Sequence, residues 1–136
     1  MPTLTRWFVK SALIYLVAAL LAAVIDVALP GNAVISALRP AYLHLFVVGW
    51  ITQMIFGVAY WMFPRFSRRR PRGSAALGWA TYVLLNLGLL LRLAGEPAEI
   101  LRSEAGLGWL LVGSATLQWL AAALFVANTW ARVKER

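Results

Sequence analysis

The chain has 136 residues and a formal net charge of +8, yet 62% of its residues are hydrophobic and only 13% are charged. Its mean hydropathy of +0.74 sets it apart from ordinary soluble domains, in which about 25% of residues are charged. Composition therefore indicates an integral membrane protein. The absence of cysteine excludes disulfides, thiolate metal sites, covalently attached c-type haem and iron–sulfur clusters within this chain.

Four apolar segments follow one another along the sequence, and each is long enough to cross a bilayer as a helix of about 20 residues. They cover approximately residues 7–29, 41–63, 75–93 and 107–131. The connections between them are short, so consecutive helices are predicted to be antiparallel neighbours. We therefore predict an all-α integral membrane protein, with residues 1–136 forming one domain, a four-transmembrane-helix up-down-up-down bundle in the lipid bilayer.

Basic residues gather at the ends of these segments, a distribution that indicates membrane orientation and not nucleic-acid binding. They flank the first segment, fill the turn after the second and follow the fourth: Arg6, Lys10, Arg65, Arg68, Arg69, Arg70, Arg72, Arg132, Lys134 and Arg136. The positive-inside rule then predicts that both termini and the basic turn are cytoplasmic, in a prokaryotic inner (plasma) membrane. Contact with anionic lipid or docking of another protein are further uses of this turn.

Small and amide residues recur every four positions in the second segment, at Gly49, Gln53 and Gly57. Such residues allow helices to approach closely and to form interhelical hydrogen bonds. Glycine also lets a flat porphyrin approach a helix backbone, and cofactor sites in bundle cores are common, so Gly49 is a candidate cofactor-binding residue. Spacing alone leaves both uses open. At about 3.6 residues per turn, this row lies roughly opposite the face that carries His44.

His44 is the only histidine, and it lies near the outer end of the second segment, about one turn after Pro40. Ionisable residues at membrane depth usually face protein, water or a ligand instead of lipid. Imidazole is also well suited to bind haem iron or a transition metal. The residues alone leave two interpretations open, a metal-binding His44 and a hydrogen-bonded histidine at a helix interface. Asp26 and Arg92 lie at a similar depth.

The stretch from Leu38-Arg-Pro-Ala-Tyr-Leu-His44 to Tyr60-Trp-Met-Phe-Pro-Arg65 resembles the second transmembrane helix of subunit I of haem–copper oxidases. The likeness is greatest to the C-type branch and to short membrane proteins similar to subunit I. In that family an Arg-Pro pair precedes the helix, and a histidine near its outer end ligates the low-spin haem b. A weaker likeness continues in Asn86-Leu-Gly-Leu-Leu-Leu-Arg92.

The resemblance implies that His44 is an axial ligand of haem b, and so a metal-binding residue, with Arg39 or Arg92 neutralising the haem propionates. Subunit I carries further haem and copper ligands on later helices, whereas this chain has a single histidine, so it is not an oxidase by itself. We therefore expect no enzyme activity from the isolated chain. The sixth iron ligand must come from His44 of a second copy, from another membrane subunit, or from Met54 or Met62, or else be absent.

Two functions are consistent with these features. In the first, the chain is a haem b protein that acts in electron transfer with a redox partner, or as an accessory to a respiratory complex. In the second, it is a haem-free structural or assembly subunit, in which His44 bonds to Asp26 or a partner. Arg92 then forms a salt bridge with Asp26 or with the glutamates of the last loop. A proton transporter is disfavoured, because the polar residues near the membrane centre are amides that do not titrate.

Overall fold

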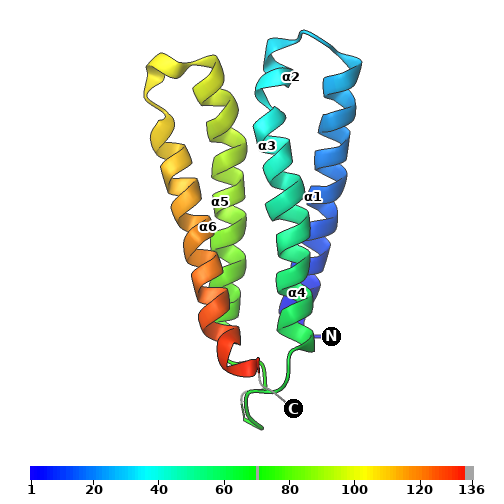
Figure 1. Cartoon of the computed structure of the whole chain (residues 1–136), viewed down its shortest axis with the longest axis vertical. Helices are drawn as coiled ribbons and strands as arrows, with labels where there is room; N and C mark the ends of the chain where they lie inside the picture. The colour runs from blue at the N-terminus through cyan, green and yellow to red at the C-terminus, as the bar shows by residue number, and fades with distance from the viewer. Residues whose placement is uncertain (70, 134–136) are drawn as a thin grey trace.

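The computed structural model describes residues 1–69 and 71–133, so Arg70, Lys134 and Arg136 lie outside the described residues. The prediction of an all-helical chain with four potential membrane-spanning helices is confirmed, and the described residues contain no strand. The four candidate spans are Thr3–Ala28, Arg39–Met62, Ala75–Leu101 and Gly108–Arg132. Figure 1 shows these helices side by side, joined at alternate ends.

The first span is the helix α1 (Thr3–Ala28), and the second is built from three parts. These parts are α3 (Arg39–His44), the π-helical segment η1 (Leu45–Thr52) and α4 (Gln53–Met62). A short helix that the sequence did not predict, α2 (Ala33–Ala37), lies between the first two spans. The side chain of Asn32 caps it by accepting hydrogen bonds from two backbone amides, which is what an asparagine at an N-cap usually does. Five residues are too few to show a helical period in the sequence.

The π-helical segment decides which side chains of the second span face α1. Buried positions recur every four residues along the second span, at Ala41, Leu45, Gly49, Gln53 and Gly57. In a regular α-helix such a row would drift around the axis by about 40° every four residues. A π-helix has a wider turn with i→i+5 hydrogen bonds, and this offsets the drift. The row of Gly49, Gln53 and Gly57 therefore continues the buried row of Ala41 and Leu45, and is closer to the His44 side than a regular helix would place it.

The third span, α5 (Ala75–Leu101), extends beyond the end at residue 93 that the sequence predicted. The reason lies in its last turns, where Glu96, Pro97 and Glu99 look like loop residues in the sequence. Pro97 is accommodated inside the helix, and Arg92 pairs with Glu96 one turn later, which stabilises helical structure at this spacing. Both glutamates are therefore helix residues. The chain continues through η2 (Ser103–Ala105) and α6 (Gly108–Thr129) to η3 (Trp130–Arg132).

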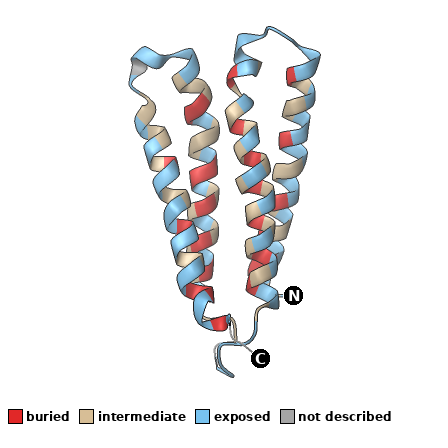
Figure 2. Cartoon of the chain, in the orientation of Figure 1, coloured by how far each residue is buried: buried red, intermediate tan, exposed pale blue. Residues whose placement is uncertain are grey.

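The interior is made of two small apolar clusters between the helices. The first joins α1, α4, α5 and α6 through Leu4, Phe8, Tyr60, Leu85 and Ala121. The second joins α1, η1 and α5 through Ala19, Leu45 and Leu89. Many large apolar side chains are exposed on the outside of the bundle, and Figure 2 shows exposed residues along all four spans. Such a surface is suited to the hydrocarbon interior of a bilayer, where apolar side chains incur no cost of exposure to water.

Charge is distributed unequally between the two ends of the bundle. The basic end, where the N-terminus lies in Figure 1, carries Arg6, Lys10, Arg65, Arg68, Arg69, Arg72 and Arg132. The opposite end, called the histidine end, carries Asp26, Arg39, His44, Arg92, Glu96, Glu99, Arg102 and Glu104. All acidic residues that the structure describes are therefore at the histidine end.

Candidate functional site

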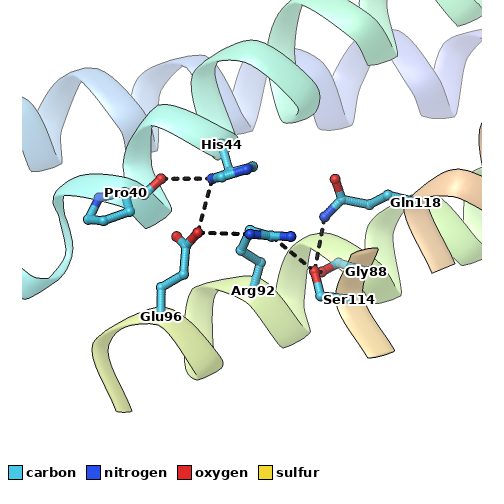
Figure 3. Close-up of polar contacts among 7 residues, drawn as sticks. All are labelled: Pro40, His44, Gly88, Arg92, Glu96, Ser114 and Gln118. Carbon is cyan, nitrogen blue, oxygen red and sulfur yellow. Dashed lines mark hydrogen bonds and ion pairs between the residues drawn. The ribbon is translucent and has the colours of Figure 1, made fainter. Parts of the chain in front are cut away.

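His44 is held at one ring nitrogen by two acceptors. Its Nδ1 lies 2.9 Å from the backbone oxygen of Pro40, one turn earlier, and 3.2 Å from Oε1 of Glu96 on α5 (Figure 3). Because both neighbours accept hydrogen bonds, Nδ1 is the nitrogen that carries the proton. In the neutral imidazole, Nε2 then bears a free lone pair. The imidazole is 36% exposed, so a group can approach it from outside the chain.

Glu96 connects His44 to a network of polar side chains on α5 and α6. Its Oε1 also accepts a hydrogen bond from Nη1 of Arg92 at 3.0 Å. Arg92 Nε donates to Ser114 Oγ at 3.2 Å, and Gln118 donates to the same oxygen at 3.0 Å. Ser114 in turn donates to the backbone oxygen of Gly88 at 2.7 Å. The residues His44, Glu96, Arg92, Ser114 and Gln118, called the His44 network, thus join three helices (Figure 3).

A second polar group at the histidine end surrounds Asp26. Arg39 donates to Asp26 Oδ2 from Nε at 3.0 Å and from Nη2 at 2.9 Å, and the Tyr42 hydroxyl donates to the same oxygen at 3.0 Å. The carboxylate is buried, while the Arg39 side chain is 61% exposed. The sequence suggested Asp26 or the glutamates of the last loop as partners of Arg92; the structure pairs Arg92 with Glu96 and Asp26 with Arg39. His44 likewise contacts Glu96 and not Asp26.

Gly49, the remaining candidate cofactor-binding residue, contacts α1, whereas His44 contacts α5. A Cβ added to Gly49 would lie 2.8 Å from Cγ of Tyr15. The space that this glycine leaves is therefore filled by the aromatic ring of Tyr15. The Tyr15 hydroxyl then donates to Asn86 on α5 at 2.8 Å. The structure therefore brings His44, Glu96 and Arg92 together, and it places Gly49 in a helix-packing contact.

Glu96 is the residue of this candidate site that the sequence did not single out, because it was assigned to a loop. The signal that could have found it is its spacing of four residues from Arg92, which places the two side chains on one face of a helix. The described residues contain no group of three or more histidine, aspartate or glutamate side chains that could hold a metal ion.

No family model, curated protein or solved structure matches the chain. The arrangement of the described side chains is therefore the basis for a functional proposal.

Proposed function

We propose that the four helices cross a prokaryotic inner membrane up-down-up-down, with both termini and the basic turn on the cytoplasmic side. The support is the charge distribution of the two ends. Every described acidic residue is at the histidine end, while Arg65, Arg68, Arg69 and Arg72 cluster in the turn at the basic end. Positively charged loops remain preferentially in the cytoplasm. His44 is then near the outer surface of the membrane.

We propose further that His44 binds haem b through Nε2 and that the protein acts in electron transfer. The observation that carries this proposal is the contact of Nδ1 with the oxygens of Pro40 and Glu96 at 2.9 and 3.2 Å. Metal-binding histidines almost always donate their other ring N–H to a carbonyl or carboxylate, which fixes the ring and raises the basicity of the ligating nitrogen. A bound haem b supplies one-electron transfer.

The two candidate arginines differ in their availability to a haem propionate. Arg39 is 61% exposed, and it uses its guanidinium partly for Asp26. Arg92 is engaged by Glu96 and Ser114, so its role is to position the carboxylate that orients His44. We therefore assign propionate contact to Arg39, through charge-assisted hydrogen bonds, and a positioning role to Arg92.

The second axial ligand is expected from a second copy of the chain, since one copy contains a single histidine. The side chains of Leu43 and Val47, close to His44 in the helix, are exposed, and they can form an apolar wall against a porphyrin between two chains. A two-fold axis makes such a site self-complementary. His44 of each copy would hold the haem, which would then supply one-electron transfer.

A haem-free structural or assembly subunit is the second candidate function. The observation that favours it is that the His44 network already joins α3, α5 and α6 through bonds of 3.2 Å or less. Interhelical hydrogen bonds of this kind stabilise membrane bundles without a cofactor. In this function His44 and Glu96 hold the second and third spans together, and a partner subunit covers the exposed faces.

The absorption spectrum of the detergent-purified protein, before and after dithionite reduction, distinguishes the two functions. We expect a b-type spectrum in the wild type, its loss in His44→Ala, and its partial return when imidazole is added to that variant. Val126→Ala truncates an exposed side chain of α6 far from His44 and should retain the spectrum. A folded wild type that stays colourless and takes up no added haem would contradict the haem proposal and support the structural subunit.

A further inference from the structure

The end of α4, the turn after it and η3 form an open polar pocket at the basic end. Its volume is about 340 Å³. The residues that matter for its chemistry are Phe63, Pro64, Arg65, Pro71, Arg72 and Arg132. Three of these carry a guanidinium group, and none carries a carboxylate. The pocket is at the opposite end of the bundle from His44 and is independent of the proposed haem site.

Arg132 gives this pocket a fixed donor. Its side chain is 1% exposed, and it donates to the backbone oxygens of Tyr60, Phe63 and Pro64 at 3.0, 2.8 and 3.0 Å. These bonds hold the guanidinium rigidly against the end of α4. Its Nη1 is also buried but has no hydrogen-bond partner in the part of the chain that the structure describes. A buried charged donor without an acceptor is costly, so Nη1 needs an acceptor from beyond the described residues.

The positive charge of the pocket indicates that the acceptor is an anion. Among the described residues, Arg132 donates hydrogen bonds only to carbonyl oxygens, which do not neutralise its positive charge, and Arg65 and Arg72 line the same pocket. The acidic residues that the structure describes lie at the histidine end. The geometry of a guanidinium group matches that of phosphate, to which it can donate two parallel hydrogen bonds. An oxyanion with several acceptor oxygens therefore suits this pocket.

We propose that this pocket binds a phosphate group, which forms ion pairs with Arg65 and Arg72 and is attracted by the positive charge of Arg132. The phosphate can be supplied by the headgroup of an anionic phospholipid or by free phosphate. The exposed Trp61 and Met62 also line the pocket, and they provide apolar surface beside it. The basic turn thus contains a specific anion site in addition to its general positive charge.

The test compares two double variants that remove the same charge. Arg65→Gln/Arg72→Gln alters the pocket and leaves Arg132 in place, whereas Arg6→Gln/Arg68→Gln removes two charges of the basic end that do not line it. Each protein in neutral detergent is titrated with short-chain phosphatidylglycerol, followed by native mass spectrometry, and with inorganic phosphate, followed by ³¹P NMR. We expect the pocket variant to lose about tenfold or more in affinity and the control to lose less than about threefold.

The two titrations distinguish the sources. Tight binding of phosphatidylglycerol with weak binding of inorganic phosphate identifies a lipid headgroup, and comparable binding of both identifies free phosphate; either supports the site. Equal losses in the two double variants, or no binding of either probe to the wild type, would overturn it. If the glutamine variant does not give a helical circular dichroism spectrum, Arg65→Lys/Arg72→Lys replaces it. That variant keeps the charge but not the bidentate geometry, and it should bind several-fold more weakly than the wild type.

Discussion

The bundle has an arginine held by several hydrogen bonds at each end, and the two arginines donate to different kinds of acceptor. Arg132 at the basic end donates to three backbone oxygens that follow or end α4. Arg92 at the histidine end donates to the carboxylate of Glu96 and the hydroxyl of Ser114. Carbonyl oxygens satisfy hydrogen bonds but do not neutralise a charge, whereas a carboxylate does both. Arg132 therefore remains an attractive point for an external anion.

The two arginines also differ in what their hydrogen bonds require of the sequence. Helix ends offer unpaired carbonyl oxygens in any sequence, so the bonds of Arg132 require only that a helix ends beside it. The bonds of Arg92 require a particular acidic residue one turn later. That carboxylate also contacts His44, and it couples an arginine to an imidazole with a free nitrogen.

Arg132→Ala should be the most destabilising of the changes considered. It removes three charge-assisted hydrogen bonds and leaves the oxygens at the end of α4 without their partner, so we expect a loss of about 4 kcal/mol in the free energy of unfolding. Unfolding in mixed detergent–SDS micelles, followed by circular dichroism, measures it. Arg68→Ala, at an exposed position of the same end, should change stability by less than about 0.5 kcal/mol. Similar losses in the two variants would show that Arg132 is not a fixed structural contact.

Glu96→Ala should destabilise the histidine end by about 3 kcal/mol, because it leaves the guanidinium of Arg92 buried without its counter-charge. Replacing Arg92 by methionine in the same chain removes that unpaired charge. The double variant should therefore be more stable than Glu96→Ala alone, and a double-mutant cycle in mixed micelles gives the coupling energy. Additive effects of the two substitutions would contradict a direct ion pair. No such rescue is expected for Arg132, whose partners are backbone atoms.

Gly57→Ala should cost about 2 kcal/mol, because a Cβ at this position would lie 2.7 Å from Cβ of Phe8 and overpacking displaces helices. Gly57 packs α4 against α1 near the basic end. At Gly113 in α6, by contrast, an added Cβ would make an ordinary van der Waals contact, 3.8 Å from Cδ1 of Leu91. Gly113→Ala should therefore stabilise the protein by about 0.5 kcal/mol through helix propensity. Melting temperatures of both variants in detergent measure the difference, and equal shifts would refute the close contact at Gly57.

The four candidate membrane-spanning helices could be predicted from the sequence, because apolar length alone sets which segments can span a bilayer. The extra turns of α5 could not, since Glu96 and Pro97 resemble loop residues until Arg92 is seen to pair with the glutamate. The row of Gly49, Gln53 and Gly57 was visible at once. The direction in which this row faces could not be predicted. The π-helical segment changes the number of residues per turn, and a periodicity argument based on a regular helix does not include that change.

His44 was recognised in the sequence as the side chain to examine, because a lone imidazole at membrane depth needs a partner whatever the fold. The identity of that partner was decided by tertiary structure. Asp26 and Glu96 are both carboxylates at the same end of the bundle, and only the packing of α3 against α5 brings Glu96 to Nδ1 at 3.2 Å. Likewise, the excess of arginine is a property of the sequence, but the pocket that collects Arg65, Arg72 and Arg132 exists only because α6 ends beside the end of α4. Composition determines how much charge and apolar surface a chain carries, and the contacts between distant segments determine which charges are neutralised.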